Sequence, residues 1–85
     1  MPIRLDELQE RARVAVREAL ARCPPIPAAF RQELVIGVRI DGNERVFELY
    51  KAGERPEDAL VIARAVLNAS TGDLKQVEVF PERWT

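Results

Sequence analysis

The chain has 85 residues and a formal net charge of −1 from 13 basic and 14 acidic side chains. This length accommodates one domain, 1–85, and a hydrophobic content of 47% excludes the disordered class. Histidine is absent and cysteine occurs once. Because histidine is the usual general base and the commonest metal ligand, we expect no catalytic triad, metal site or cofactor, and no enzyme.

The sequence has no membrane-span pattern, since no window approaches the roughly 18 continuous apolar residues of such a span. Residues 1–6 also lack the basic-then-apolar layout of a secretory signal. The single Cys23 cannot form an internal disulfide, and a free thiol suits a reducing compartment. We therefore expect a cytoplasmic protein without a membrane partner, in which dimerisation through Cys23 is an open alternative.

A helix is predicted over residues 6–22, where Asp6 and Gln9 match a capping box. Its opposite side places glutamates three or four residues before arginines, which is typical of a solvated face. Three prolines then end the helix, so residues 23–31 are expected to form a stiff connector. The apolar residues at helical spacing are Leu5, Leu8, Ala12, Ala15, Val16, Ala19 and Cys23.

The period changes to two after residue 32, which predicts a hairpin over residues 33–51 with a turn at Asp41–Glu44. A three-residue loop would place Ile36 opposite Glu48 on the core face. A two- or four-residue loop instead aligns Phe47 and Leu49 with Ile36 and its neighbours. We favour the second register.

A second helix is predicted over residues 56–69, because Pro56 suits a first helical turn and acidic residues follow it. Residues 59–67 contain one charge in nine positions, which is too apolar for a helix with a wet outer face. We therefore expect helix one and a partner or second subunit to cover it. A strand over residues 74–80 and a tail over residues 81–85 complete the chain.

The element order predicts an α+β fold of two layers, α-β-β-α-β. Two helices would pack on one face of a three-stranded mixed sheet, because the strands alternate and cannot be buried on both faces. The last strand would return parallel through a right-handed crossover. We favour a split arrangement, with this strand beside the first strand, over its addition beside the second.

The residue patterns give little support to bound phosphates, metals or a reactive thiol. The four glycines lie at separate places rather than in one loop before a helix. The cluster at Asp41–Glu44 resembles the opening of a calcium loop but lacks the later ligands, so we interpret it as a turn. Cys23 lies in the apolar stripe of the first helix without a histidine to activate it, and we interpret it as a structural thiol.

The face of the sheet away from the helices mixes aliphatic, aromatic and charged side chains, as protein interfaces do. Trp84 is either an exposed anchor of this surface or folds back over the sheet edge, and an unpaired strand edge offers strand addition as a second route. The candidate partner-binding residues are Val35, Arg39, Val46, Tyr50, Phe80 and Trp84.

Our leading hypothesis is a small non-catalytic protein-binding module of inhibitor, immunity, antitoxin or adaptor type, acting through an exposed sheet face or edge and able to form a homodimer. The alternative is a nucleic-acid-binding protein that uses the arginines of the first helix. Residues 1–32 hold six arginines against four acidic residues, which is a weak phosphate footprint. The first strand also offers no outward aromatic residue for base stacking, so we favour a protein partner.

Overall fold

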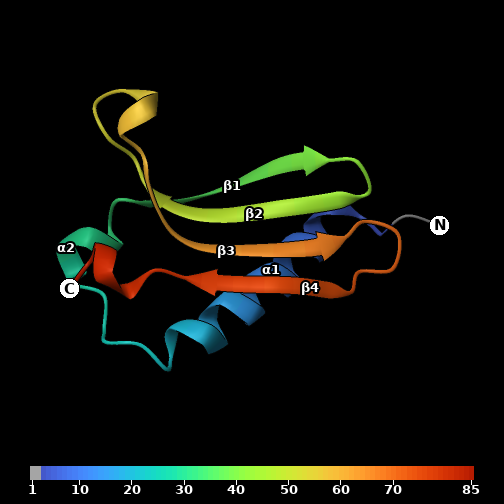
Figure 1. The fold of residues 1–85 in the computed structure, drawn as a ribbon, viewed down its shortest axis with the longest axis horizontal. Coiled ribbons are helices and arrows are strands. Elements are labelled where there is room, and N and C mark those ends of the chain that lie inside the picture. Colours follow the sequence, from blue (N-terminus) through green and yellow to red (C-terminus); the bar gives the residue numbers. More distant parts are fainter. Residues whose placement is uncertain (1–2) are drawn as a thin grey trace.

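The computed structural model describes residues 3–85, which fold into one long helix on a four-stranded antiparallel sheet (Figure 1). The α+β class is confirmed, whereas the three-stranded mixed sheet and the second long helix are wrong. The elements are α1 (Leu5–Leu20), α2 (Ala28–Arg31), β1 (Leu34–Asp41), β2 (Glu44–Lys51), β3 (Leu60–Asn68) and β4 (Leu74–Val79), with 3-10 turns at Pro56–Asp58 and Pro81–Arg83.

The four strands follow one another in the sheet in chain order, β1-β2-β3-β4, and every neighbouring pair is antiparallel. The predicted split crossover is therefore wrong. The link 52–59 between β2 and β3 holds only a 3-10 turn and projects from the sheet at the upper left of Figure 1. Since β3 returns next to β2, β1 and β4 are left as the two edges of the sheet.

The segment predicted as the second helix is the central strand β3. Its α1 side is buried and its outer face carries Val61 and Val66 beside Arg64, so its sequence lacks the clear alternation of a half-exposed strand. The register shifts between Leu49 and Tyr50 of β2, which leaves Ile62 without a direct partner and lets it join Ala63 in the core. The apolar run therefore reflects the central position of β3 and does not require a second subunit.

The hairpin of β1 and β2 has the register that we favoured. The pairs Ile36–Leu49 and Val38–Phe47 lie opposite each other, and a two-residue turn joins the strands. Gly42 occupies this turn with a φ of 60°, a conformation that glycine adopts without a steric cost. Because opposite residues point to the same face, Val38 and Phe47 both point to the α1 side of the sheet.

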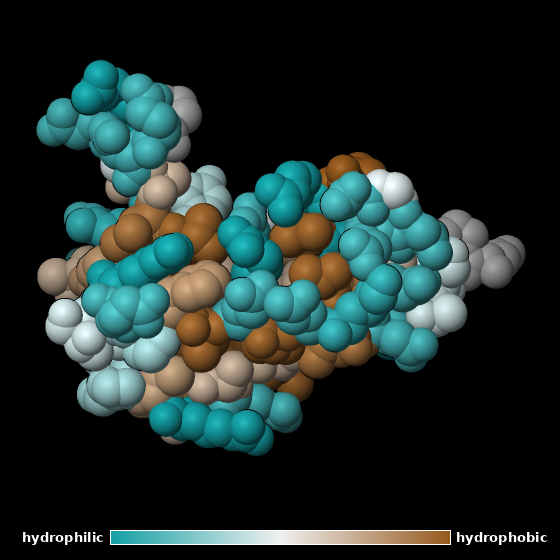
Figure 2. Space-filling view, viewed as in Figure 1, coloured by the Kyte–Doolittle hydropathy of each residue, from teal (hydrophilic) through white to brown (hydrophobic). Residues whose placement is uncertain are grey.

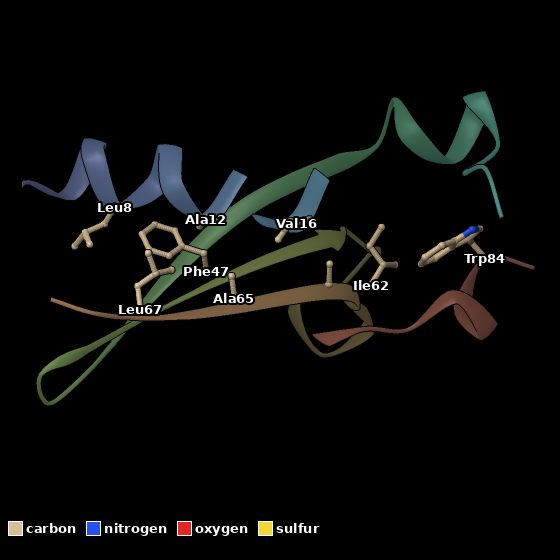
Figure 3. Close-up of a cluster of buried hydrophobic side chains, with 9 residues drawn as sticks. Leu8, Ala12, Val16, Phe47, Ile62, Ala65, Leu67 and Trp84 are labelled. Atoms are coloured by element: carbon tan, nitrogen blue, oxygen red, sulfur yellow. The ribbon is translucent and has the colours of Figure 1, made fainter. Parts of the chain in front are cut away.

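Helix α1 buries Leu8, Ala12 and Val16 against the sheet, chiefly over β3 and β4 (Figure 3). Two of the three predicted ion pairs form, Glu7–Arg11 at 3.2 Å and Glu10–Arg13 at 3.3 Å, whereas the predicted pair of Glu18 with Arg22 is absent from residues 3–85. The predicted capping box is wrong, since Arg4 is the N-cap residue and makes no side-chain cap hydrogen bond. The helix also ends at Leu20, two residues before the predicted end.

The last turn of the chain folds back onto the core. The Trp84 side chain is 8% exposed and packs in the same cluster as Ile62 and Val16. Its indole N–H donates a hydrogen bond to the Pro24 carbonyl oxygen at 3.1 Å. The proline-rich connector is thereby tied to the C-terminal end. Among residues 3–85, none of the helices combines the length and apolarity needed to cross a membrane.

Candidate protein-binding surface on β1

The sheet has two faces, and the candidate residues from the sequence belong mainly to the outer face, which points away from α1 and is seen in Figure 2. Val35 and Tyr50 lie opposite each other across β1 and β2, and so do Arg39 and Val46. The structure therefore brings these four together. Val46 is only 3% exposed, however, so little of it is available to a partner.

The two remaining candidates lie elsewhere. Phe80 follows β4 and is half-buried, with the Arg83 guanidinium 4.3 Å from its ring centroid. Trp84 is part of the core, as described above. The structure thus selects the fold-back alternative for Trp84 and removes this residue from the exposed surface.

On the outer face of the sheet, the charged and aromatic side chains contact neighbouring residues of the same face. At its centre the Arg64 guanidinium lies 2.8 Å from the Glu48 carboxylate and 4.0 Å from that of Glu78. Tyr50 lies across the backbone of Gly37, where a Cβ atom would be 3.2 Å from its ring. This pairing of charges and packing of the aromatic ring leave Val35 as the large apolar side chain exposed on the outer face of β1, at 44%.

The α1 side of β1 is more open. Val38 is 44% exposed and Ile40 is 67% exposed, although both alternate with the residues that point outward. Helix α1 runs behind β3 and β4 and leaves β1 uncovered (Figure 1). Of the six exposed large apolar residues in 3–85, three lie on β1, so exposed apolar surface is concentrated on this strand.

A groove, which we call the α1–β1 groove, lies between α1, the connector and the first two strands and encloses about 800 Å³. Its apolar lining comes from all of these elements, and its polar lining consists of Gln9, Arg13, Arg17 and Arg31. No acidic residue lines it within the described part of the chain. The apolar lining residues are Val16, Leu20, Ala21, Pro24, Pro25, Ile26, Leu34, Ile36, Phe47 and Leu49.

The outer edge of β1 is unpaired within residues 3–85, because β1 pairs only with β2. Asp41 and Glu44 flank the turn and face each other, so they are expected to exchange the hydrogen bonds that close the hairpin. In an antiparallel pair, every second residue then directs its N–H and C=O groups away from the partner strand. Ile40, Val38 and Ile36 therefore offer their backbone groups to the free edge.

Val38 and Ile40 are not among the residues predicted from the sequence to bind a partner, because the alternation of β1 predicts that their face of the strand lies in the core. The signal that indicates an exposed face is the number of helices compared with the number of strands. Once residues 60–68 form a strand, a single long helix remains for four strands, and a helix about 10 Å wide covers only about two strands spaced about 4.8 Å apart. Part of the apolar α1-side face must then remain open.

Other chemistry has little basis in the described residues. Residues 3–85 contain no group of three or more histidine, cysteine, aspartate or glutamate side chains arranged to hold a metal ion. Cys23 is half-buried, and its Sγ lies 3.6 Å from the Ala19 carbonyl oxygen. Comparison with protein-family models, curated proteins and solved structures finds no match to this chain.

Proposed function

We propose that this protein is a non-catalytic protein-binding module of inhibitor, immunity, antitoxin or adaptor type, and that its partner docks on β1. The observation that carries this proposal is the exposure of Val38 and Ile40 on a strand whose outer edge is also unpaired. An apolar strand at an open edge attracts other chains unless a partner covers it. We therefore place the partner-binding surface on the α1 side of β1 and on its free edge, instead of on the outer face of the sheet that the sequence predicts.

A protein partner suits this surface better than a nucleic acid does. Phosphate contacts require exposed basic groups, and the β1 surface is formed mainly by aliphatic side chains. Arg11 of α1 is engaged by Glu7 and by the Gly72 carbonyl oxygen. Interface cores are apolar and contain few charged residues, which matches Ile36, Val38 and Ile40.

The test compares affinity purifications from the native host of the tagged wild-type chain and two variants. Val38→Asp places a charge on the proposed surface, whereas Val14→Asp places it on α1 at a side chain with nearly the same exposure, 43% against 44%. A stoichiometric partner that accompanies the wild type and Val14→Asp, and is lost with Val38→Asp, supports the proposal. Recovery of the same proteins with all three chains, or recovery of none, contradicts it.

A further inference from the structure

The arginines of the α1–β1 groove lie along one flank of α1. Gln9, Arg13 and Arg17 follow one another at intervals of four residues, so they form one row on the helix. Arg31 adds a third guanidinium from the end of α2. Arg17 and Arg31 make no ion pair within residues 3–85, and Arg13 has only the exposed contact with Glu10.

This row is unfavourable for the isolated helix, because like charges at i and i+4 destabilise a helix by a few tenths of a kcal/mol. Arg11, the arginine of α1 outside this row, is paired with Glu7. The groove is thus an apolar floor along which the charges of Arg17 and Arg31 have no acidic partner within residues 3–85. A negatively charged ligand in the groove would compensate the positive charge of these arginines.

The dimensions of the open surface fit a helix. Beside α1, the open strip is formed by β1 and by the half-buried Leu49 of β2, since Phe47 of β2 is only 1% exposed. Eight residues of β1 extend about 26 Å, the length of a helix of about 17 residues. A strand added to the edge of β1 would leave the apolar floor uncovered, whereas a helix placed beside α1 would cover it.

A second copy of this chain fits the groove poorly. The long helix of residues 3–85, α1, already uses its apolar side against the sheet, so a second copy has to present the same groove. In such a symmetric pairing, each groove would meet a second groove that also carries three arginines and is lined by no acidic residue within residues 3–85. The positive charge therefore favours a different protein over a homodimer at this surface.

We infer that the α1–β1 groove takes an acidic amphipathic helix of the partner protein, which lies beside α1 with its carboxylates at Arg13, Arg17 and Arg31. Its apolar side contacts Ile36 in the groove and extends along β1 to Val38, the next residue on the same face of the strand. This rests on the proposed function and specifies the partner. Apolar anchors at helical spacing would provide the contact area, and the arginines would select the acidic helix.

The test uses synthetic probes with the full chain. The first is a 16-residue peptide, the length of α1, with leucines at helical spacing and glutamates elsewhere. The second replaces every glutamate by lysine. The third alternates glutamate and valine to favour an extended strand, and laurate serves as a small amphipathic carboxylate. Binding is measured by fluorescence anisotropy with the labelled peptides, and laurate is tested by displacement.

We expect the acidic helical peptide to bind at least tenfold more tightly than the lysine peptide and than either other probe. The Arg17→Gln/Arg31→Gln variant should bind the acidic helical peptide roughly tenfold more weakly than the wild type, and its affinity should depend less on salt. The Arg4→Gln/Arg55→Gln variant has the same net charge but retains the groove arginines, and it should bind like the wild type. Val38→Asp should also weaken binding at least tenfold.

Equal binding of the acidic and lysine peptides overturns the inference, as does tighter binding of the extended peptide or of laurate. Equal effects of the two arginine variants overturn it as well, because they would indicate attraction by net charge alone. The absence of binding up to about 1 mM has the same meaning. These outcomes leave the proposed function standing if Val38→Asp still loses a partner from the host, so the two failures are distinguishable.

Discussion

Replacing Trp84 tests whether the C-terminal end is part of the core. Two losses follow from the structure when this side chain is truncated: its packing at 8% exposure, and its hydrogen bond to the Pro24 carbonyl. Trp84→Ala should lower the free energy of unfolding by about 3 to 5 kcal/mol. Trp84→Phe keeps much of the packing and loses the hydrogen bond, so it should cost about 1 to 2 kcal/mol.

The assay is urea unfolding followed by far-UV circular dichroism, because Trp84 is the only tryptophan and its fluorescence is lost in both variants. With a slope of about 1 kcal/mol per molar urea, the midpoint should fall by roughly 1 to 2 M for Trp84→Phe. A domain of this size is stable by about 4 to 13 kcal/mol, so the alanine variant can be unfolded in water and the phenylalanine variant is decisive. The buried position of Trp84 would be refuted if the urea midpoint of Trp84→Phe equals that of the wild type and the midpoint of Trp84→Ala falls by less than about 0.5 M.

Three further predictions concern stability, each measured by thermal or urea unfolding. Gly72→Ala should cost more than Gly42→Ala, because both glycines have positive φ but a Cβ at Gly72 would meet the Arg11 and Ile3 side chains whereas one at Gly42 meets nothing within 4 Å; equal losses would contradict the close packing of Gly72. Arg64→Ala should cost about 1 kcal/mol because Glu48 and Glu78 lose their shared cation, whereas Arg4→Ala removes a highly exposed pair with Asp6 and should change little; the reverse order would be inconsistent with this network. Asn68→Ala should cost about 1 to 2 kcal/mol, since its Oδ1 accepts the backbone N–H groups of Ser70 and Thr71 at 2.8 and 3.0 Å, and an unchanged stability would argue against this role.

Some elements of this fold follow directly from the sequence. The helical spacing of Leu8, Ala12 and Val16 predicts α1, and these three side chains are its buried positions. The alternation in β1, together with the turn residues after it, predicts the hairpin. Even the facing of its side chains follows, because a two- or four-residue loop keeps Glu48 off the core face whereas a three-residue loop does not. In each case one side of the element faces the core and the other faces solvent, so the periodicity is clear.

The strand β3 could not be predicted in the same way. Val61 and Val66 lie beside Arg64 on the outer face of β3 while its α1 side is apolar, and a short apolar run of this kind cannot be distinguished from a buried helix by periodicity. Ala63 and Ala65 favour a helix by intrinsic propensity, yet here they are buried on the α1 side of the strand. This single error also changed the number of helices and strands and the direction of the last strand.

The outer face was predicted as the partner-binding surface because β3 was predicted as a second helix. With two helices on the sheet, Val38 and Ile40 would be core residues, and the outer face would be the natural place for a partner. With one helix, the α1 side of β1 is exposed and the outer face is satisfied by its own ion pairs. The α1 side of β1 is exposed because a single helix is narrower than a four-stranded sheet. The residue pattern of β1 by itself carries no information about how many helices cover the sheet.

Photo-crosslinking in the native host tests the central claim, which is that a partner protein docks on the α1 side of β1. A photoreactive amino acid is placed in turn at Val38, at Val35 on the opposite face of the same strand, and at Val14 on α1. These three side chains have nearly equal exposure, 44%, 44% and 43%, so differences in crosslinking report the surface contacted. We predict one discrete protein adduct from position 38 that is absent or much weaker from positions 35 and 14. An adduct from position 35 alone, or equal adducts from all three positions, would contradict the account.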